Sequence, residues 1–217
     1  MSDPRATYLS APAHSRDEVL AKGCPVPAVP GVYGWWFDEL PSNEIDTAGC
    51  YQRDGLTLLY AGISPSKPPT TGKAPSRQSI RTRIRYHYRG NAYGSTLRLT
   101  LGCLLGIPLR RVGSGHRLHF HEGESRLNEW MGAHAFVSWV THPEPWTLED
   151  ELIESYDLPL NLMGNRRNAF HPQLTAVRFA AKRAAIELPV LPNQGRTRST
   201  LQSPEASRLG VETRRRR

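Results

Sequence analysis

The residue most able to do chemistry is Glu149, because its place on a predicted helix puts a carboxylate on an apolar face. Thr147 is a suitable N-cap, and we expect the helix to run from there to about Asp157. At about 100° per residue, Glu149 falls inside the apolar sector that extends from Leu148 to Ile153. A carboxylate on an apolar face is costly unless it is paired, protonated or bound to a cation. An acid favoured by the helix dipole, with its head group in water, is the equally consistent alternative. The other acidic residues of the segment project to the opposite side: Asp150, Glu151 and Glu154.

A second candidate pair is Arg83 and His87, which lie four residues apart in a segment with helical periodicity. Ile80, Ile84 and Tyr88 form the apolar stripe of this predicted helix, and the two basic side chains follow one edge of it. An arginine binds phosphate through its bidentate fork, and a histidine can donate or accept a proton. Both side chains could therefore reach a phosphate in a cleft. A basic helix on a solvated face is the other interpretation.

The remaining pattern predicts the elements that must position these side chains. An aromatic and β-branched run follows Pro30-Gly31, and a second apolar run follows the turn signal Asp54-Gly55. Residues 64–78 are rich in proline and are expected to form a loop. The expected strands are 32–37, 56–63, 117–120 and 135–140, and the expected helices are 79–88, 96–105, 147–157 and 172–187.

In this order the segments resemble the GIY-YIG nuclease superfamily over roughly residues 28–172. Gly31-Val32-Tyr33 stands where the family has its GIY tripeptide, and Tyr60-Ala61-Gly62 stands where it has YIG. The helix with Arg83 and His87 is similar to a family helix in which an arginine is followed four positions later by a histidine. Glu149 and Asn161 match the family's glutamate helix and its closing asparagine. The spacer 34–59 and the loop 64–78 are longer than in compact members of the family.

The resemblance implies an α+β fold with a small, mainly antiparallel central sheet of three core strands, flanked by helices. It implies hydrolysis of a DNA phosphodiester with one divalent ion, Mg²⁺ or Mn²⁺, held by Glu149. Arg83 would bind the scissile phosphate, and Tyr33 would orient or deprotonate the attacking water. Tyr60 and His87 would contact the phosphate or relay the proton. Which of Tyr33, Tyr60 and His87 is the general base stays open.

Three further positions of the motif have expected structural roles. Asn161 would pin the backbone near the glutamate helix. Gly31 belongs to the first tripeptide, and Gly62 would let its strand approach the cleft where a Cβ atom would crowd it.

Basic residues beside these motifs are candidates for gripping the DNA backbone. Arg81 and Arg85 lie on the predicted basic helix, and a polar cluster beyond the closing asparagine contributes Arg166, Arg167 and His171. The alternative for the cluster is a solvated loop between helices.

The length of 217 residues corresponds to one ordinary domain with extensions. We expect a loosely ordered N-terminal extension over residues 1–25 and a GIY-YIG-like domain over 26–188. Within that domain, residues of about 90–134 are interpreted as an insertion. Residues 189–217 are rich in arginine and are expected to form a disordered tail.

Charge and hydropathy limit the possible partners. The net charge of +8 and the pI near 9.8 favour a polyanion, with DNA as the expected partner. A mean hydropathy of -0.51, without an apolar run near ~20 residues, excludes a membrane span. The first residues lack the pattern of a secretory signal, and the cysteines are widely spaced, so we expect a cytoplasmic protein with reduced thiols.

Two other classes of function stay open. One is a DNA-binding adaptor that keeps the fold but does not cut, and the other is an RNA-binding basic protein whose function depends on the tail. For a nuclease with one centre per chain, a double-strand break would need two events or a homodimer.

Overall fold

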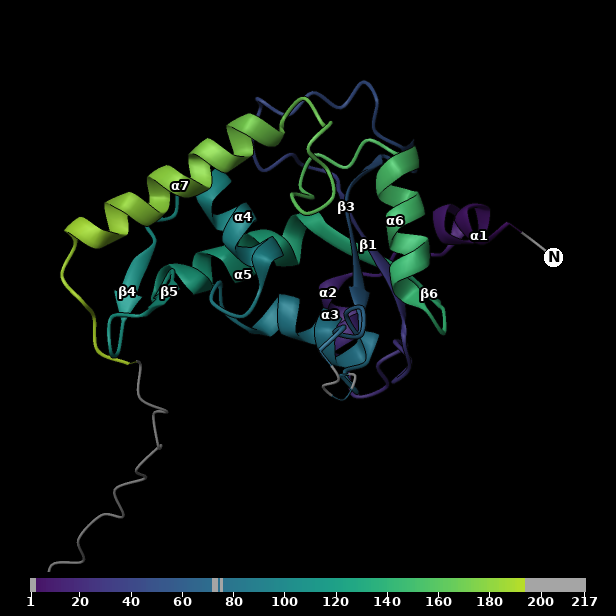
Figure 1. Ribbon diagram of the computed structural model, residues 1–217, viewed down its shortest axis with the longest axis horizontal. Coiled ribbons are helices and arrows are strands. Elements are labelled where there is room, and N and C mark those ends of the chain that lie inside the picture. Colours follow the sequence, from purple (N-terminus) through teal and green to yellow (C-terminus); the bar gives the residue numbers. More distant parts are fainter. Residues whose placement is uncertain (1–2, 72–73, 75, 194–217) are drawn as a thin grey trace, which may run out of the picture.

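The fold is built on an antiparallel sheet, seen at the centre of Figure 1 in a computed structural model that describes residues 3–71, 74 and 76–193. Its strands follow the order β2-β3-β1-β6. The predicted α+β fold with a small antiparallel sheet is confirmed, and a short edge strand adds to the three core strands. The strands are β1 (Gly31–Phe37), β2 (Gln52–Arg53), β3 (Leu56–Ser64) and β6 (Ala135–Thr141).

The central strand β1 is buried along its whole length, on both faces. Because alternate side chains of a strand point to opposite faces, β1 contributes to two separate cores. Val32 packs in the core that includes α6 (Pro145–Ser155). Tyr33 packs in the core that includes α3 (Ile80–Arg89). The same strand therefore ties together the two helices that carry the candidate chemistry.

Helix α3 follows the predicted apolar stripe. Ile80, Ile84 and Tyr88 are all fully buried. The helix begins after Ser79, whose Oγ accepts a hydrogen bond from the backbone N–H of Thr82 and so satisfies one free donor of the first turn. Of the basic residues of the helix, Arg81, Arg83 and Arg85 are partly exposed, whereas His87 is buried together with the apolar stripe.

Helix α6 begins earlier than predicted, and Thr147 is not its N-cap. The first helical residue is Pro145, because proline presets the backbone angle of a first turn and lacks only an N–H that would be unpaired there. The hydroxyl of Thr147 instead donates to the carbonyl oxygen of Glu144 at 2.8 Å. The helix ends at Ser155, two residues before the expected end.

The segment interpreted as an insertion folds into the same domain. It forms α4 (Thr96–Leu104), the hairpin of β4 (Arg110–Val112) and β5 (Arg117–His119), and α5 (Gly123–His134). Side chains of α4 and α5 share the core that holds Tyr33. Helix α4 packs against α7 (His171–Glu187), and Figure 1 shows α7 and the hairpin extending together to one side of the sheet.

The N-terminal segment is ordered, so the prediction of a loose extension is wrong for residues 3–25. It forms α1 (Pro4–Ser10) and α2 (Arg16–Leu20), in which Tyr8 and Val19 are fully buried. His14 exchanges two backbone hydrogen bonds of 2.9 Å with Val137. This pairing covers the outer edge of β6 and protects it from pairing with another chain. The order of the N-terminal segment could not be predicted because its apolar residues, although they pack tightly, are too few to show a periodicity.

At the other end, Leu191 exchanges backbone hydrogen bonds with the hairpin strand β4 and the residue after it, Gly113. The predicted arginine-rich tail lies outside the described residues from 194 on, so its disorder stays a prediction. Within the described part of the chain, no helix has both the length and the apolar character to cross a bilayer.

Replacing Tyr8 tests the packing of the N-terminal segment. Tyr8→Ala is expected to lower the free energy of unfolding by about 3–5 kcal/mol, because it leaves a cavity in the core. Tyr8→Phe should leave stability unchanged or raise it, since the buried hydroxyl has no partner among the described residues. Urea denaturation measures both, with the exposed Tyr93→Ala as the control. Equal stability of Tyr8→Ala and wild type would contradict this packing.

Candidate active site

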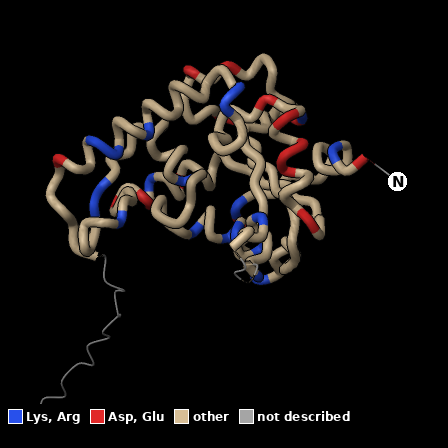
Figure 2. Tube along the Cα trace, in the orientation of Figure 1, with Lys and Arg blue, Asp and Glu red and all other residues tan. Residues whose placement is uncertain are grey.

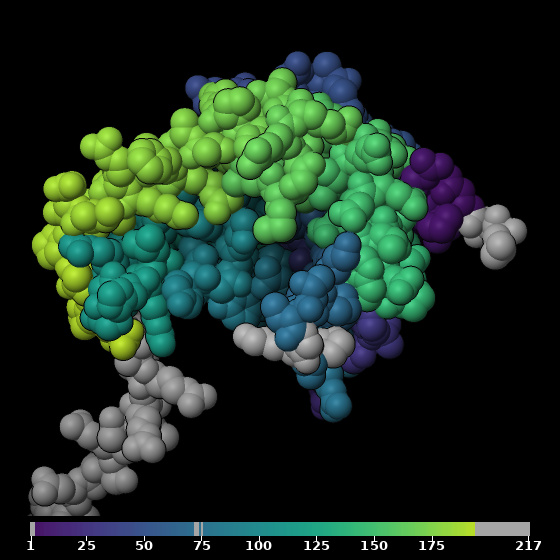
Figure 3. Space-filling model, in the orientation of Figure 1, coloured from purple at the N-terminus to yellow at the C-terminus, as the bar shows by residue number. Residues whose placement is uncertain are grey.

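Residues from five elements, one of them contributing only Thr96 of α4, converge on one pocket of about 770 Å³. It lies where β1 and β3 meet α3 and α6, and the loop after α6 forms part of its rim. Figure 3 shows the surface hollowed where the green segments of α6 and this loop approach the blue segments. Six residues selected from the sequence line the pocket: Tyr33, Tyr60, Arg83, Glu149, Asn161 and Arg167.

Tyr33 reaches the pocket from the centre of the sheet. It pairs with Gly62 of β3, and its ring lies directly across that glycine. A Cβ atom at Gly62 would come within 2.7 Å of the Tyr33 hydroxyl oxygen, so only glycine permits this ring position. Gly31 has a similar role at the start of β1, where a Cβ atom would collide with the carbonyl oxygen of Val140. The two motif glycines therefore allow close approach, as expected for Gly62.

His87 lies behind Tyr33 and does not line the pocket. Its Nε2 is 2.9 Å from the Tyr33 hydroxyl, its Nδ1 is 2.7 Å from Oγ of Ser95, and the side chain is fully buried. Burial lowers its pKa well below the ordinary value, and the nearby charges of Arg83 and Arg98 lower it further. His87 was expected either to contact the phosphate beside Arg83 or to relay a proton, and its absence from the pocket lining disfavours the first of these two roles. Its connection to the pocket runs through Tyr33.

The two phenols and Arg83 share one electrostatic environment. Burial raises the pKa of Tyr60 to about 12, and the charge of Glu149 adds to this rise. Burial also raises the pKa of Tyr33 well above its ordinary value, while Arg83 opposes the rise through its charge and a hydrogen bond. Arg83 itself donates from Nη1 to the carbonyl oxygen of Gly94 at 2.9 Å. Both phenols are therefore neutral at pH 7 in the protein alone.

Glu149 projects from α6 into the pocket and is partly buried, as the helical wheel predicts. Burial, with a smaller contribution from the charge of the neighbouring Asp150, raises its pKa to about 7. Its carboxylate makes no hydrogen bond or ion pair with another described residue. The remaining acidic side chains of the helix are exposed, and Figure 2 shows acidic positions gathered along α6. Asp150 and Glu154 also line the pocket, so the prediction that they project to the opposite side is wrong for these two and holds only for Glu151. Glu149 is thus a carboxylate that lacks a compensating cation.

Asn161 holds strand β3 in place beside Tyr60. Its Oδ1 accepts from the backbone N–H of Ala61 at 2.9 Å, and its Nδ2 donates to the carbonyl oxygen of Ala61 at 2.8 Å. The asparagine does pin a backbone near the glutamate helix, and the pinned segment is β3, which packs against α6. Because Asn161 follows α6 closely in the chain, these bonds fix the distance between the strand with Tyr60 and the helix with Glu149.

The residues selected as DNA contacts are not gathered at one place. Arg81 donates from Nε to the carbonyl oxygen of Val26 at 2.5 Å, and Arg85 is partly buried without lining the pocket. Arg167 lines the pocket, yet its guanidinium donates to two carbonyl oxygens at the end of α6. Arg166 is exposed, and His171 is the first residue of α7.

Three residues near the site were not selected from the sequence. Lys67 and Trp146 line the pocket. Arg178 of α7 lies close enough for its charge to lower the pKa of Tyr60, and burial lowers its own pKa. Lys67 is in a loop without periodicity, and Arg178 follows an ordinary helical pattern. Nothing in the sequence therefore indicated that either residue lies near the pocket.

The raised pKa of Glu149 predicts a stability that depends on pH. Its pKa is about 7 in the folded protein and 4.5 ordinarily, so between these values the folded state holds a proton that unfolding releases. The free energy of unfolding should therefore fall as pH rises through this window. Glu149→Gln removes the effect and should exceed wild type by up to about 3 kcal/mol at pH 8, but not at pH 4.

Urea denaturation at the two pH values measures this difference, and the exposed Glu151→Gln on the same helix is the matched control. A Glu149→Gln protein with the same stability difference at both pH values would contradict the buried position of this carboxylate.

Comparison with known families agrees with this geometry. A family model described as the GIY-YIG catalytic domain matches residues 31–180, which is more than half of the chain and includes every pocket residue discussed above. No curated protein and no solved structure gave a significant match. The matched range begins at the first motif glycine and ends within α7. The chain therefore belongs to the GIY-YIG nuclease superfamily.

Proposed function

We propose that this protein is a divalent-metal-dependent endonuclease that hydrolyses phosphodiester bonds of DNA. The observation that carries the proposal is the convergence of two phenols, one guanidinium and one uncompensated carboxylate on a single pocket. These groups come from segments far apart in the chain, and each has a use in phosphodiester hydrolysis. Membership of the nuclease superfamily supports the reaction class.

The chemistry of Glu149 fits a hard divalent cation. A partly buried carboxylate with a raised pKa and no cationic partner among the described residues gains most from a bound cation. Mg²⁺ keeps several of its waters and often takes only one or two carboxylates from the protein, so a single ligand is sufficient. Mn²⁺ has the same preference for oxygen ligands. When bound, such an ion polarises the phosphate and lowers the pKa of a bound water.

The other pocket residues act on the substrate directly. Arg83 binds the scissile phosphate and offsets the negative charge that builds up in the transition state. Tyr33 orients the attacking water through its hydroxyl, which is neutral at pH 7 in the protein alone. Tyr60, with a pKa of about 12, donates a hydrogen bond to a phosphate oxygen. Asn161 keeps these groups in register through its bonds to β3.

A DNA substrate is supported by the charge of the chain. The net charge of +8 attracts a polyanion, and Figure 2 shows basic positions on α3 and along α7. Arg166 is exposed beside the rim residue Arg167, where a DNA backbone would enter. The free thiols of Cys24, Cys50 and Cys103 fit a reducing compartment, so we include a cytoplasmic location in the proposal. Two cuts, or a homodimer, would complete a double-strand break.

A plasmid cleavage assay tests the proposal. Wild type with Mg²⁺ or Mn²⁺ is expected to nick or linearise plasmid, and a chelator should stop it. Glu149→Gln should lose at least about 100-fold in rate because the cation loses its protein ligand, and Arg83→Ala should lose a similar factor through poorer transition-state stabilisation. Gel electrophoresis of the plasmid forms gives the rates.

The matched controls are Glu151→Gln and Arg89→Ala, which are exposed residues of the same two helices and do not line the pocket. Both should cut at the wild-type rate. If wild type binds plasmid but leaves it uncut with either metal, the protein is a non-cleaving adaptor. If it binds RNA in preference to DNA and does not cut DNA, the RNA-binding alternative replaces the proposal.

A further inference from the structure

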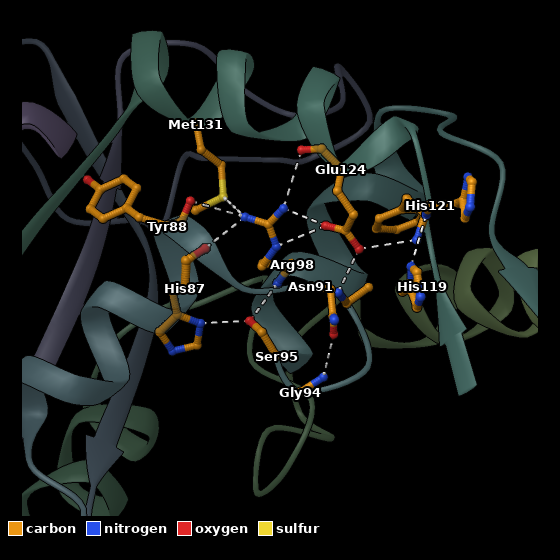
Figure 4. A network of polar contacts seen from close by, with 12 residues as sticks. His87, Tyr88, Asn91, Gly94, Ser95, Arg98, His119, His121, Glu124 and Met131 are labelled. Carbon is orange, nitrogen blue, oxygen red and sulfur yellow. Dashed lines mark hydrogen bonds and ion pairs between the residues drawn. The ribbon is translucent and has the colours of Figure 1, made fainter. Parts of the chain in front are cut away.

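A buried chain of hydrogen bonds connects Ser95, His87 and Tyr33. Oγ of Ser95 is 2.7 Å from Nδ1 of His87, and Nε2 of His87 is 2.9 Å from the Tyr33 hydroxyl. All three side chains are essentially inaccessible to solvent. Figure 4 shows the first of these links, with Ser95 at the start of α4 facing the imidazole. Because an imidazole can donate from either nitrogen, the direction of the chain depends on where the protons are.

Ser95 determines that direction. It is the N-cap of α4, and its Oγ accepts from the backbone N–H of Arg98 at 3.1 Å. An N–H group cannot accept a proton, so the hydroxyl proton of Ser95 needs another acceptor. Nδ1 of His87 is the only other partner of this oxygen among the described residues. If Nδ1 carried the proton instead, the serine hydroxyl would be buried without an acceptor.

His87 is neutral in this environment, so it carries one proton. Burial and the charges of Arg83 and Arg98 all disfavour the imidazolium. With Nδ1 accepting from Ser95, that proton is on Nε2, which therefore donates to the hydroxyl oxygen of Tyr33. Tyr33 accepts on this side, so its own proton points away from His87, and Tyr33 is one of the residues that line the pocket.

The surrounding contacts hold the imidazole in this arrangement. Arg98 is fully buried, donates from Nη1 to the carbonyl oxygen of His87 at 3.0 Å, and forms an ion pair with Glu124 of α5 at 2.5 Å. Figure 4 shows this guanidinium between the end of α3 and α5. Trp35 packs edge-on against the ring, at 5.7 Å between centroids. The insertion thus fixes both the backbone and the ring of His87.

We infer that Ser95 is a positioning residue of the active site, which fixes the neutral His87 as a donor to Tyr33 and so directs the Tyr33 hydroxyl proton into the pocket. The inference rests on the proposed function for its catalytic meaning. In this arrangement His87 does not take the proton of Tyr33. The phenol keeps its proton, as its raised pKa requires, and its hydroxyl is directed to orient the attacking water of the proposed function.

The direct test is a long-range ¹H–¹⁵N spectrum of the full-length protein at pH 7, without DNA or metal. The signals of His87 are assigned by their loss in His87→Gln. The expected result is a protonated Nε2 and an unprotonated Nδ1, which give clearly separated ¹⁵N shifts. A proton on Nδ1, or on both nitrogens, would overturn the inference. This spectrum does not depend on cleavage, so its result is separate from that of the plasmid assay.

Variants of Ser95 then test the cause. Ser95→Ala removes the donor, and signals of the Nδ1-protonated form should appear, whereas Ser95→Thr keeps the hydroxyl and the wild-type spectrum. If Ser95→Ala leaves the Nε2 proton in place as in wild type, Ser95 does not set the tautomer. The rate of DNA cleavage should change together with the tautomer of His87. We expect Ser95→Ala to reduce kcat by roughly tenfold at unchanged KM, and Ser95→Thr to keep the wild-type kcat.

Ser15→Ala is the matched control, because it removes an N-cap serine from α2, which lies outside the pocket. It should lose stability without changing the His87 spectrum or kcat. An equal fall of kcat in Ser15→Ala would show that loss of a helix cap explains the effect of Ser95→Ala.

Discussion

The partly buried carboxylate of Glu149 is the constraint on which the rest of the site depends. Its helix packs against the sheet through apolar side chains, and this packing partly buries Glu149 in the pocket, while Asp150 and Glu154 line the same pocket as exposed side chains. Without a cation the charge is disfavoured, which is why its pKa rises to about 7. The pocket therefore contains a carboxylate whose negative charge is not compensated by the protein. In the proposed function a divalent ion, bound together with a phosphate, would compensate it. Arg83 and the two phenols line the same pocket as this carboxylate.

The sheet supplies the rigidity that this arrangement needs. Tyr33 lies on the central strand, where the pairing with Gly62 leaves room for its ring, and Asn161 fixes β3 through both polar groups of Ala61. Behind Tyr33, the insertion adds Ser95 and a fully buried Arg98 that hold His87. The insertion thus supports the pocket from behind, and only Thr96 of it lines the pocket itself.

Much of this could be predicted because it depends on local periodicity and short motifs. The strand with Tyr33, the stripe of α3 and the inward angle of Glu149 all follow from residues close together in the chain. The complete burial of His87 could not be predicted. A helical wheel gives the direction of a side chain, but it does not show how closely Tyr33 and α4 pack against the edge of the apolar stripe of α3. The pairing of His14 with Val137 and the bond partner of Asn161 also depend on contacts between distant segments. Thr147 was a plausible cap, but a proline two residues earlier begins the helix.

The central claim is that Glu149 holds a divalent cation in a pocket where Arg83 and Tyr33 face a DNA phosphate. The most direct measurement is anomalous diffraction from crystals of the protein grown with a short DNA duplex and soaked in Mn²⁺. The account predicts an anomalous peak at ligand distance from the Glu149 carboxylate, with a backbone phosphate between that peak and the Arg83 guanidinium. A DNA complex in which Mn²⁺ binds elsewhere, or in which the phosphates bypass this pocket, would contradict it.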